Sequence, residues 1–218
     1  MRVAACAAVL ASLGALINIP AADAEPCPDV EVVFARGTGG PVGVGIIGQS
    51  FADALRTDVA PRTVAVYAVD YPASTDYLTA IEGVNDAANH VRQTVAACPA
   101  TRIALGGYSQ GAGVMALLTS DGSLAGSPAL PGMPGPLPPD VADRIAAVTL
   151  FGKPSAELVT SMGLPVLTVG PVFAGRTLEL CVDGDPICSA AQGSIVPHLL
   201  YGVNGMAAEA ADFTARRL

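Results

Sequence analysis

Tryptophan is absent from this 218-residue sequence, and aromatic residues make up only 5% of it. Proteins that hold sugar rings by stacking use large aromatic side chains, so the composition argues against a carbohydrate-stacking groove. Positive charge is also scarce, with 11 basic residues against 19 acidic ones and a net charge of −8. Such a surface repels phosphate backbones and offers no basic cluster, so we expect no nucleic-acid partner.

Motifs for nucleotide cofactors and for metals are missing as well. The glycine-rich stretch 37–40 lacks the Lys-Ser/Thr ending of a phosphate-binding loop, and no Gly-x-Gly-x-x-Gly stands there in the right register. The chain has only two histidines, and neither Cys-x-x-Cys spacing nor clustered histidines occur. We therefore expect neither a metal nor a cofactor.

The N-terminus has the pattern of a secretory signal peptide. Arg2 precedes an apolar run at 3–19, and Ala22 and Ala24 supply the small residues that a signal peptidase recognises. The run is short and interrupted, so we expect removal of residues 1–24 and no transmembrane segment in the mature chain. The remaining residues 25–218 fit one domain. We expect a secreted monomer, with association with the cell wall as a further option.

Cysteine usage agrees with export. Once Cys6 leaves with the signal peptide, an even set of four cysteines remains. Cys181 and Cys188 bracket a short loop, whereas Cys27 and Cys98 lie near the ends of separate predicted elements. We predict the disulfides Cys27–Cys98 and Cys181–Cys188.

Short β-branched and aromatic runs alternate with helical patterns along the mature chain. Strands are predicted at 29–35, 63–70, 101–108, 144–151 and either 177–182 or 166–170. We prefer 177–182 as the last strand because Cys181 closes it. The alternation predicts an α/β fold, a three-layer sandwich with a roughly five-stranded parallel sheet and helices on both faces. No insertion is long enough for a cap domain.

The stretch 103–113 joins the third predicted strand to a helix and carries the Gly-x-Ser-x-Gly pattern of a nucleophile elbow. In this pattern the serine lies on a strained turn. Side chains at Gly107 or Gly111 would collide with neighbouring backbone, which accounts for the two glycines. We predict that Ser109 is a nucleophile at the C-terminal edge of the sheet; a plain glycine-rich turn is the alternative.

Two later segments are placed relative to Ser109. The Pro/Gly/Ser-rich loop 120–139 joins the end of the elbow helix to the next strand, so we expect it under the sheet, away from Ser109. The tail 197–218 is predicted to form a terminal helix.

A serine nucleophile needs a base, and the base needs a carboxylate; on this type of sheet they follow in the order Ser, Asp or Glu, His. His90 precedes Ser109 and is interpreted as a surface residue, which leaves His198 as the base. The acid is predicted within the loop between Cys181 and Cys188, just past the last strand. Asp185 is preferred there, with Asp183 as the alternative.

The oxyanion hole needs backbone N–H groups that face the developing charge. Gln110, directly after the nucleophile, supplies one. Thr38, between glycines after the first strand, is predicted to supply the other, and its hydroxyl could add a third donor. A plain turn at 36–39 is the alternative.

Two apolar segments are predicted as lips of the site: 71–78 and 195–200. In the second, four apolar side chains surround His198: Ile195, Val196, Leu199 and Leu200. Apolar lips favour acyl chains or a lipid–water interface over peptides. Packing of these residues under the terminal helix is the alternative.

Together, these residues resemble the cutinase family, most closely the secreted cutinase-like serine esterases of actinobacteria. The resemblance is carried by these motifs: Phe-Ala-Arg-Gly-Thr at 34–38, Gly-Gly-Tyr-Ser-Gln-Gly at 106–111, Asp-Pro-Ile-Cys at 185–188, and His198 with Tyr201. It implies a lidless α/β-hydrolase with catalytic Ser109, Asp185 and His198, oxyanion positions Thr38 and Gln110, and both disulfides. The segments 120–139 and 158–176 depart from the family pattern.

The predicted function is hydrolysis of carboxylic esters with short to medium acyl chains, on lipid or polyester-like substrates, through an acyl-enzyme. A phospholipase or thioesterase acting on lipids is one alternative. Acetylated sugars stay open as substrates because acetylxylan esterases share the fold. A catalytically silent, secreted lipid-binding protein is the alternative outside enzymes.

Overall fold

The computed structural model describes residues 26–122, 130–189 and 192–218, so the predicted signal peptide lies outside the described residues. Five parallel strands form one sheet in the order β2-β1-β3-β4-β5. The strands are β1 (Val30–Ala35), β2 (Val64–Ala68), β3 (Arg102–Tyr108), β4 (Ile145–Phe151) and β5 (Thr177–Leu180). The α/β fold and the choice of 177–182 for the last strand are therefore confirmed.

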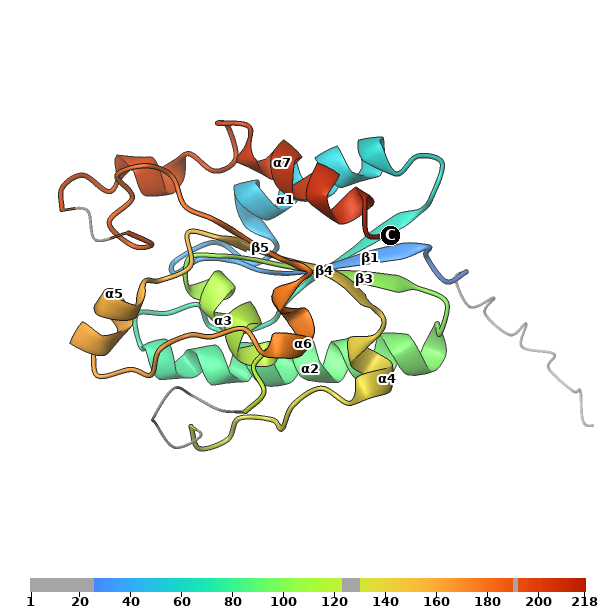
Figure 1. Ribbon diagram of the computed structural model, residues 1–218, viewed down its shortest axis with the longest axis horizontal. Coiled ribbons are helices and arrows are strands. Elements are labelled where there is room, and N and C mark those ends of the chain that lie inside the picture. The colour runs from blue at the N-terminus through green and yellow to red at the C-terminus, as the bar shows by residue number, and fades with distance from the viewer. Residues whose placement is uncertain (1–25, 123–129, 190–191) are drawn as a thin grey trace, which may run out of the picture.

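Helices cover both faces of the sheet, which gives three layers (Figure 1). Helices α1 (Gly45–Asp58) and α7 (Met206–Ala215) lie on one face, and α2 (Ala80–Ala97) and α3 (Gln110–Leu118) lie on the other. The shorter helices are α4 (Pro139–Ala142), α5 (Ala156–Ser161) and α6 (Pro171–Ala174), with 3₁₀ turns η1 (Tyr77–Thr79) and η2 (Val196–Leu199). In the part of the chain that is described, no helix is long and apolar enough to cross a membrane.

Strand β1 shows why the sheet is central. All six of its residues are buried, as expected for a parallel strand covered on both faces. Val30, Val32 and Phe34 face the core under α1 and α7, whereas Val33 and Ala35 face the core under α2 and α3. This alternation follows directly from the two-residue period of a strand.

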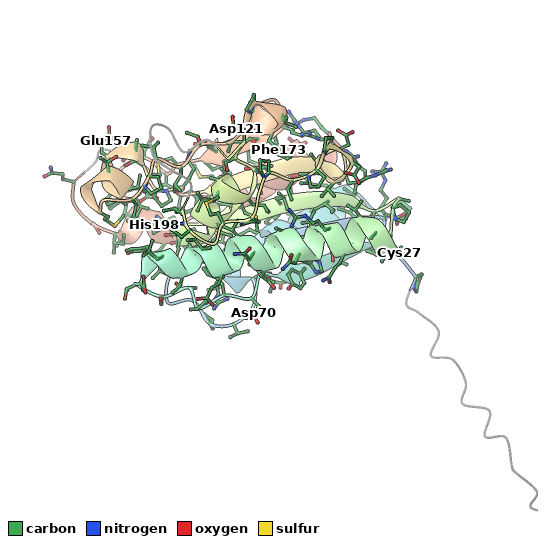
Figure 2. The ribbon with its side chains drawn as sticks, turned by 90° about the horizontal axis from the view of Figure 1, so that it is seen from below. Cys27, Asp70, Asp121, Glu157, Phe173 and His198 are labelled. Atoms are coloured by element: carbon green, nitrogen blue, oxygen red, sulfur yellow. A yellow bond between two sulfur atoms is a disulfide. The ribbon has the colours of Figure 1, made fainter. Side chains whose placement is uncertain are left out.

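Both predicted disulfides are present. Cys27–Cys98 ties the start of the described chain to the end of α2, with Cα atoms 5.5 Å apart. Cys181–Cys188 closes the loop after β5, with Cα atoms 5.8 Å apart. Figure 2 shows Cys27 at one end of the molecule and His198 at the other.

The predicted terminal helix at 197–218 is wrong in its first part. Residues 196–199 form the separate turn η2, and α7 begins only at Met206. Gly205, the residue directly before α7, adopts φ +93°, a left-handed conformation that favours glycine and that a continuous helix through this position would not contain.

The loop 120–139 is not confined to the underside of the sheet as predicted. Residues 120–122 and 130–139 are the described parts of this loop, and the second part contacts α2, where the Asn85 side-chain amide donates to the Gly132 carbonyl at 2.9 Å. Leu130 lines the same cavity as Ser109. Packing of the half-buried Leu130 and Met133 against the apolar core, together with this hydrogen bond, holds this part of the loop beside that cavity.

Candidate active site

Ser109 occupies the turn between β3 and α3 with φ 55° and ψ −120°, a strained conformation that a serine rarely adopts. The flanking glycines explain how the turn fits. A Cβ atom at Gly107 would lie 2.2 Å from the Gly111 carbonyl oxygen, and one at Gly111 would lie 2.0 Å from that of Ala35. No side chain fits at either position, as the sequence pattern predicted.

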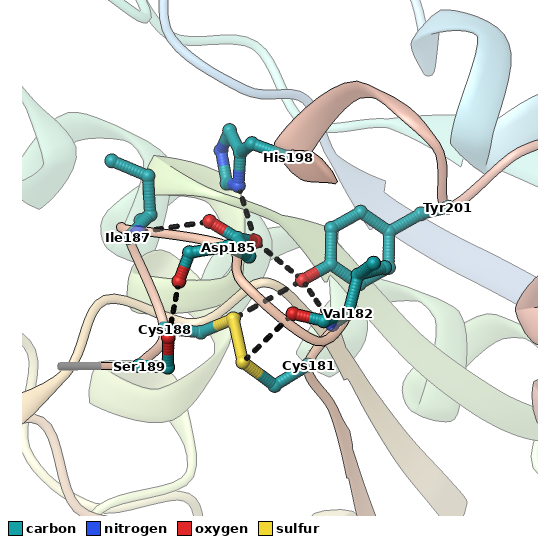
Figure 3. Close-up of a disulfide and its surroundings, with 8 residues drawn as sticks. All are labelled: Cys181, Val182, Asp185, Ile187, Cys188, Ser189, His198 and Tyr201. Carbon is teal, nitrogen blue, oxygen red and sulfur yellow. Dashed lines mark hydrogen bonds and ion pairs between the residues drawn. A yellow bond between two sulfur atoms is a disulfide. The ribbon is translucent and has the colours of Figure 1, made fainter. Parts of the chain in front are cut away.

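Asp185, inside the loop closed by Cys181–Cys188, meets His198 (Figure 3). The Asp185 carboxylate is fully buried, and its Oδ2 lies 2.7 Å from His198 Nδ1. The Ile187 backbone N–H donates to Oδ1 at 2.8 Å. Asp183, the alternative acid, is exposed. The structure thus brings Asp185, and not Asp183, to the histidine.

Tyr201 is a third member of this cluster. Its hydroxyl donates to Asp185 Oδ2 at 2.6 Å and accepts from the Val182 N–H at 3.1 Å (Figure 3). It also lies 3.2 Å from Cys188 Sγ. The sequence offered a signal for it, a tyrosine three residues after the candidate base, but we assigned it no role.

The charge on Asp185 is stabilised despite its burial. Burial alone would raise the pKa of this carboxyl, but the hydrogen bonds from His198, Tyr201 and the Ile187 N–H outweigh it and hold the pKa below its ordinary value. Burial and the neighbouring Asp185 carboxylate raise the pKa of the Tyr201 phenol. Asp185 is therefore an acceptor for His198, and Tyr201 remains a donor.

Tyr108, the residue before Ser109, holds His198 from the other side. Its ring stacks on the imidazole with centroids 4.8 Å apart, and its hydroxyl donates to the His198 carbonyl at 2.6 Å. Burial, and then the Asp185 charge, raise the pKa of Tyr108 to about 12. Consecutive residues thus carry the candidate nucleophile and a support for the candidate base.

Gly152, at the end of β4, makes room for the same imidazole. A Cβ atom there would lie 2.9 Å from His198 Cε1 and 3.0 Å from the Tyr201 hydroxyl oxygen. Within the described residues no hydrogen bond joins the Ser109 hydroxyl to His198. Such bonds are often long in the free enzyme and tighten when substrate binds.

Thr38 and Gln110, the two predicted oxyanion positions, lie next to each other. The Thr38 hydroxyl is 3.0 Å from Gln110 Oε1, and the buried Nε2 of that amide has no hydrogen-bond partner in the described structure. A 180° turn of the amide would let Nε2 donate to Thr38 Oγ1, which would free the threonine proton for an oxyanion.

Ser109, Thr38 and Gln110 open into an apolar cavity of about 160 Å³. Its walls come from η1, α2, α3 and the segment around α5. They include Tyr77, Leu78, Ile81, Leu117, Leu130, Leu158, Val159, Met162, Leu164 and Leu167. We had not assigned the segment 158–176 to the site, although its apolar residues were the available signal.

The two predicted lips behave differently. Tyr77 and Leu78, from the first, line this cavity. The four apolar residues of the second do not line it but are exposed, from 36% for Leu200 to 63% for Leu199. The alternative, that they pack under the terminal helix, is therefore wrong.

His90 is not the plain surface residue that we expected. Its ring stacks on Tyr67 with centroids 3.4 Å apart, and its Nε2 lies 2.9 Å from the Glu31 carboxylate. Burial would raise the pKa of Glu31, but hydrogen bonds from His90 and Thr94 lower it overall. This cluster joins β1 and β2 to α2.

The described residues contain no group of three or more His, Cys, Asp or Glu side chains that could hold a metal.

This chain is similar to known esterases in sequence and in fold. The family model described as Cutinase matches residues 26–218. Carboxylesterase Culp1 of Mycobacterium tuberculosis is 45% identical over 217 residues, covering 96% of this chain and 93% of Culp1. Phospholipase Culp4 of the same organism is 46% identical over 192 residues, covering 88% and 80%. A solved structure of Trichoderma reesei cutinase with a C11Y4 phosphonate inhibitor has a TM-score of 0.65 and 35% identity, covering 88% of this chain and 77% of that one.

Proposed function

Since this chain belongs to the cutinase family and is a carboxylic ester hydrolase, we propose that it is a secreted serine esterase that works through Ser109, His198 and Asp185. The observation that carries the proposal is the buried Asp185–His198 pair, hydrogen-bonded at 2.7 Å beside the strained Ser109 turn. Secretion is supported by the two disulfides and by the signal-like N-terminus.

The reaction begins with attack of Ser109 Oγ on the ester carbonyl carbon, while His198 takes the serine proton at Nε2. Asp185 holds the Nδ1–H and stabilises the imidazolium that forms. The negative oxygen of the tetrahedral intermediate accepts hydrogen bonds from the N–H groups of Gln110 and Thr38.

Collapse of this intermediate breaks the bond to the alcohol oxygen, which leaves with the proton from His198. Water then attacks the acyl-enzyme, with His198 as base again, and releases the carboxylic acid and free Ser109. No other reactant is needed. The base must be a neutral imidazole to accept the serine proton.

The acyl chain fits the apolar cavity beside Ser109. A dry cavity of about 150 Å³ is known to hold a benzene molecule, so a cavity of about 160 Å³ suits roughly six carbon atoms. We propose esters of short to medium acyl chains as substrates. One relative is named a phospholipase, so phospholipids belong among the esters to be compared.

The test is hydrolysis of a p-nitrophenyl ester series by the mature protein, beside Ser109→Ala. We expect a maximum near six carbons and a loss of at least about 10⁴-fold in kcat in the variant. A phosphonate should label the wild-type protein at Ser109 and leave the variant unlabelled. An unlabelled, folded wild-type protein without turnover would overturn the proposal and favour a lipid-binding role.

A further inference from the structure

A second hollow, of about 540 Å³, lies across Thr38 from the acyl cavity. Among the described residues, Thr38 is the one that lines both. The first cavity is walled by α2 and α3, whereas the second is walled by the connection after β1 and by the first turns of α1, on the opposite face of the sheet (Figure 1). We call this second hollow the α1 groove. Its size is within the usual range for a ligand site.

The α1 groove lies on the same side of the nucleophile as His198. Tyr108 lines the groove, and its ring stacks on the imidazole. The chain that carries His198 also packs against the groove wall: a methyl group placed at Gly202 would lie 3.4 Å from Ile46 Cγ2 and 3.6 Å from Ser50 Oγ. The groove and the candidate base are therefore neighbours.

This position matters for the leaving group. When the tetrahedral intermediate collapses, the alcohol oxygen takes its proton from His198, so the alcohol must lie on the side of the imidazole. The acyl chain stays bonded to Ser109 and occupies the apolar cavity on the other side of Thr38. We infer that the α1 groove binds the alcohol half of the ester, an inference that rests on the proposed esterase function.

The lining of the groove suggests which alcohols fit. The groove surface is mainly apolar, with Val44 and Ile46 among its residues, and the polar side chains Gln49, Ser50 and Asp53 also line it. The mixture matches an alcohol that has both a carbon skeleton and free hydroxyl groups, such as glycerol.

Charge in the groove argues for an uncharged alcohol. Arg36 is the one cation among the lining residues, all of which are described, and it is buried with its N–H groups donated to the carbonyls of Gly40, Val69 and Tyr71. The exposed Asp53 carboxylate pairs with Arg56, which does not line the groove. A phosphate in the alcohol half would meet a carboxylate and no available cation. The groove thus favours glyceride-type esters over phospholipids.

The experiment compares two esters with the same acyl chain, glyceryl monohexanoate and methyl hexanoate. Gln49→Trp, at an exposed lining position, narrows the α1 groove, and Thr57→Trp, at an exposed position further along α1 that does not line the groove, is the matched control. We expect Gln49→Trp to lower kcat/KM for the glyceryl ester by at least about tenfold, the scale set by lost pocket contacts, and to leave the methyl ester within about twofold. Thr57→Trp should change neither.

Equal losses on both esters, or no loss on either, would refute the role of the groove while the esterase function stands. Wild-type protein that hydrolyses neither ester would refute the proposed function, and the groove's role with it. Turnover of the methyl ester reports that Gln49→Trp is folded. If it is not folded, Gln49→Phe, with a smaller ring at the same exposed position, gives the same comparison.

Discussion

Removal of one oxygen atom, in Tyr201→Phe, tests the support that the buried acid receives. The phenol is fully buried, donates to Asp185 Oδ2 at 2.6 Å and accepts from the Val182 N–H at 3.1 Å. Phenylalanine keeps the ring and its packing against Phe151, where the centroids are 6.2 Å apart. The change is therefore confined to these two hydrogen bonds and the contact of the hydroxyl with Cys188 Sγ.

The magnitude follows from those two bonds. A hydrogen bond to a charged acceptor contributes about 1.5–3 kcal/mol, and a buried N–H left unpaired costs about 1 kcal/mol or more. We expect the free energy of unfolding to fall by about 2–4 kcal/mol, which lowers Tm by roughly 5–15 °C in a domain of this size.

The loss of stability in Tyr201→Phe should depend on pH, and its direction can be worked out. The pKa of Asp185 is lowered in the folded protein, so its ionisation stabilises the fold above the unfolded-state pKa, and this contribution is lost as pH falls through the folded pKa. Tyr201→Phe removes one cause of the lowering. The difference in stability between wild type and variant should be largest near neutral pH and should shrink in acid.

Thermal unfolding across pH, together with kcat and KM on one ester, measures both effects. Tyr67→Phe is the matched control, since its hydroxyl also lies 3.0 Å from a carboxylate, that of Asp86, away from the candidate site. We expect Tyr201→Phe to lower kcat with little change in KM, and Tyr67→Phe to leave kcat unchanged. If Tyr201→Phe had the same Tm and the same kcat as the wild-type protein, the reasoning would be refuted.

Three further predictions concern the core, the elbow and the acyl cavity. Glu31→Gln should destabilise the protein by about 1.5–3 kcal/mol near neutral pH, and the cost should vanish as pH falls through the lowered pKa of Glu31, as measured by denaturant unfolding. Gly111→Ala should yield no folded protein by circular dichroism, because its Cβ would lie 2.0 Å from the Ala35 carbonyl oxygen, whereas Gly135→Ala, with nothing within 4 Å, should fold normally. Ile81→Trp should fill the acyl cavity and move the preferred ester to shorter chains; an unchanged preference would exclude that cavity as the acyl site.

Much of the fold was predictable because its signals are local. The strand patterns and the Gly-x-Ser-x-Gly spacing depend on neighbours in sequence, and β3 with its turn at Ser109 forms as expected. The last strand was chosen correctly because Cys181 marks its end. The sequence favoured Asp185 as the acid but left Asp183 as an alternative. Both residues lie in one short loop, and only the fold decides which of them is buried.

The errors come from contacts that sequence spacing does not encode. The local sequence does not show that the chain near Leu130 contacts α2. The hydrogen bond that joins them, from Asn85 to Gly132, links residues 47 positions apart. The terminal helix was started too early because apolar spacing does not reveal the backbone conformation of Gly205. His90 gains its partners from β1 and β2, which only the packed sheet brings to α2.

The position of Thr38 between two hollows has a consequence for how such enzymes can diverge. The acyl cavity takes its walls from helices on one face of the sheet, and the α1 groove takes its walls from the other. Residues that line one of these hollows can therefore be substituted without disturbing the other hollow. A lineage that keeps the same serine turn could change the acid it releases and the alcohol it accepts as two independent traits.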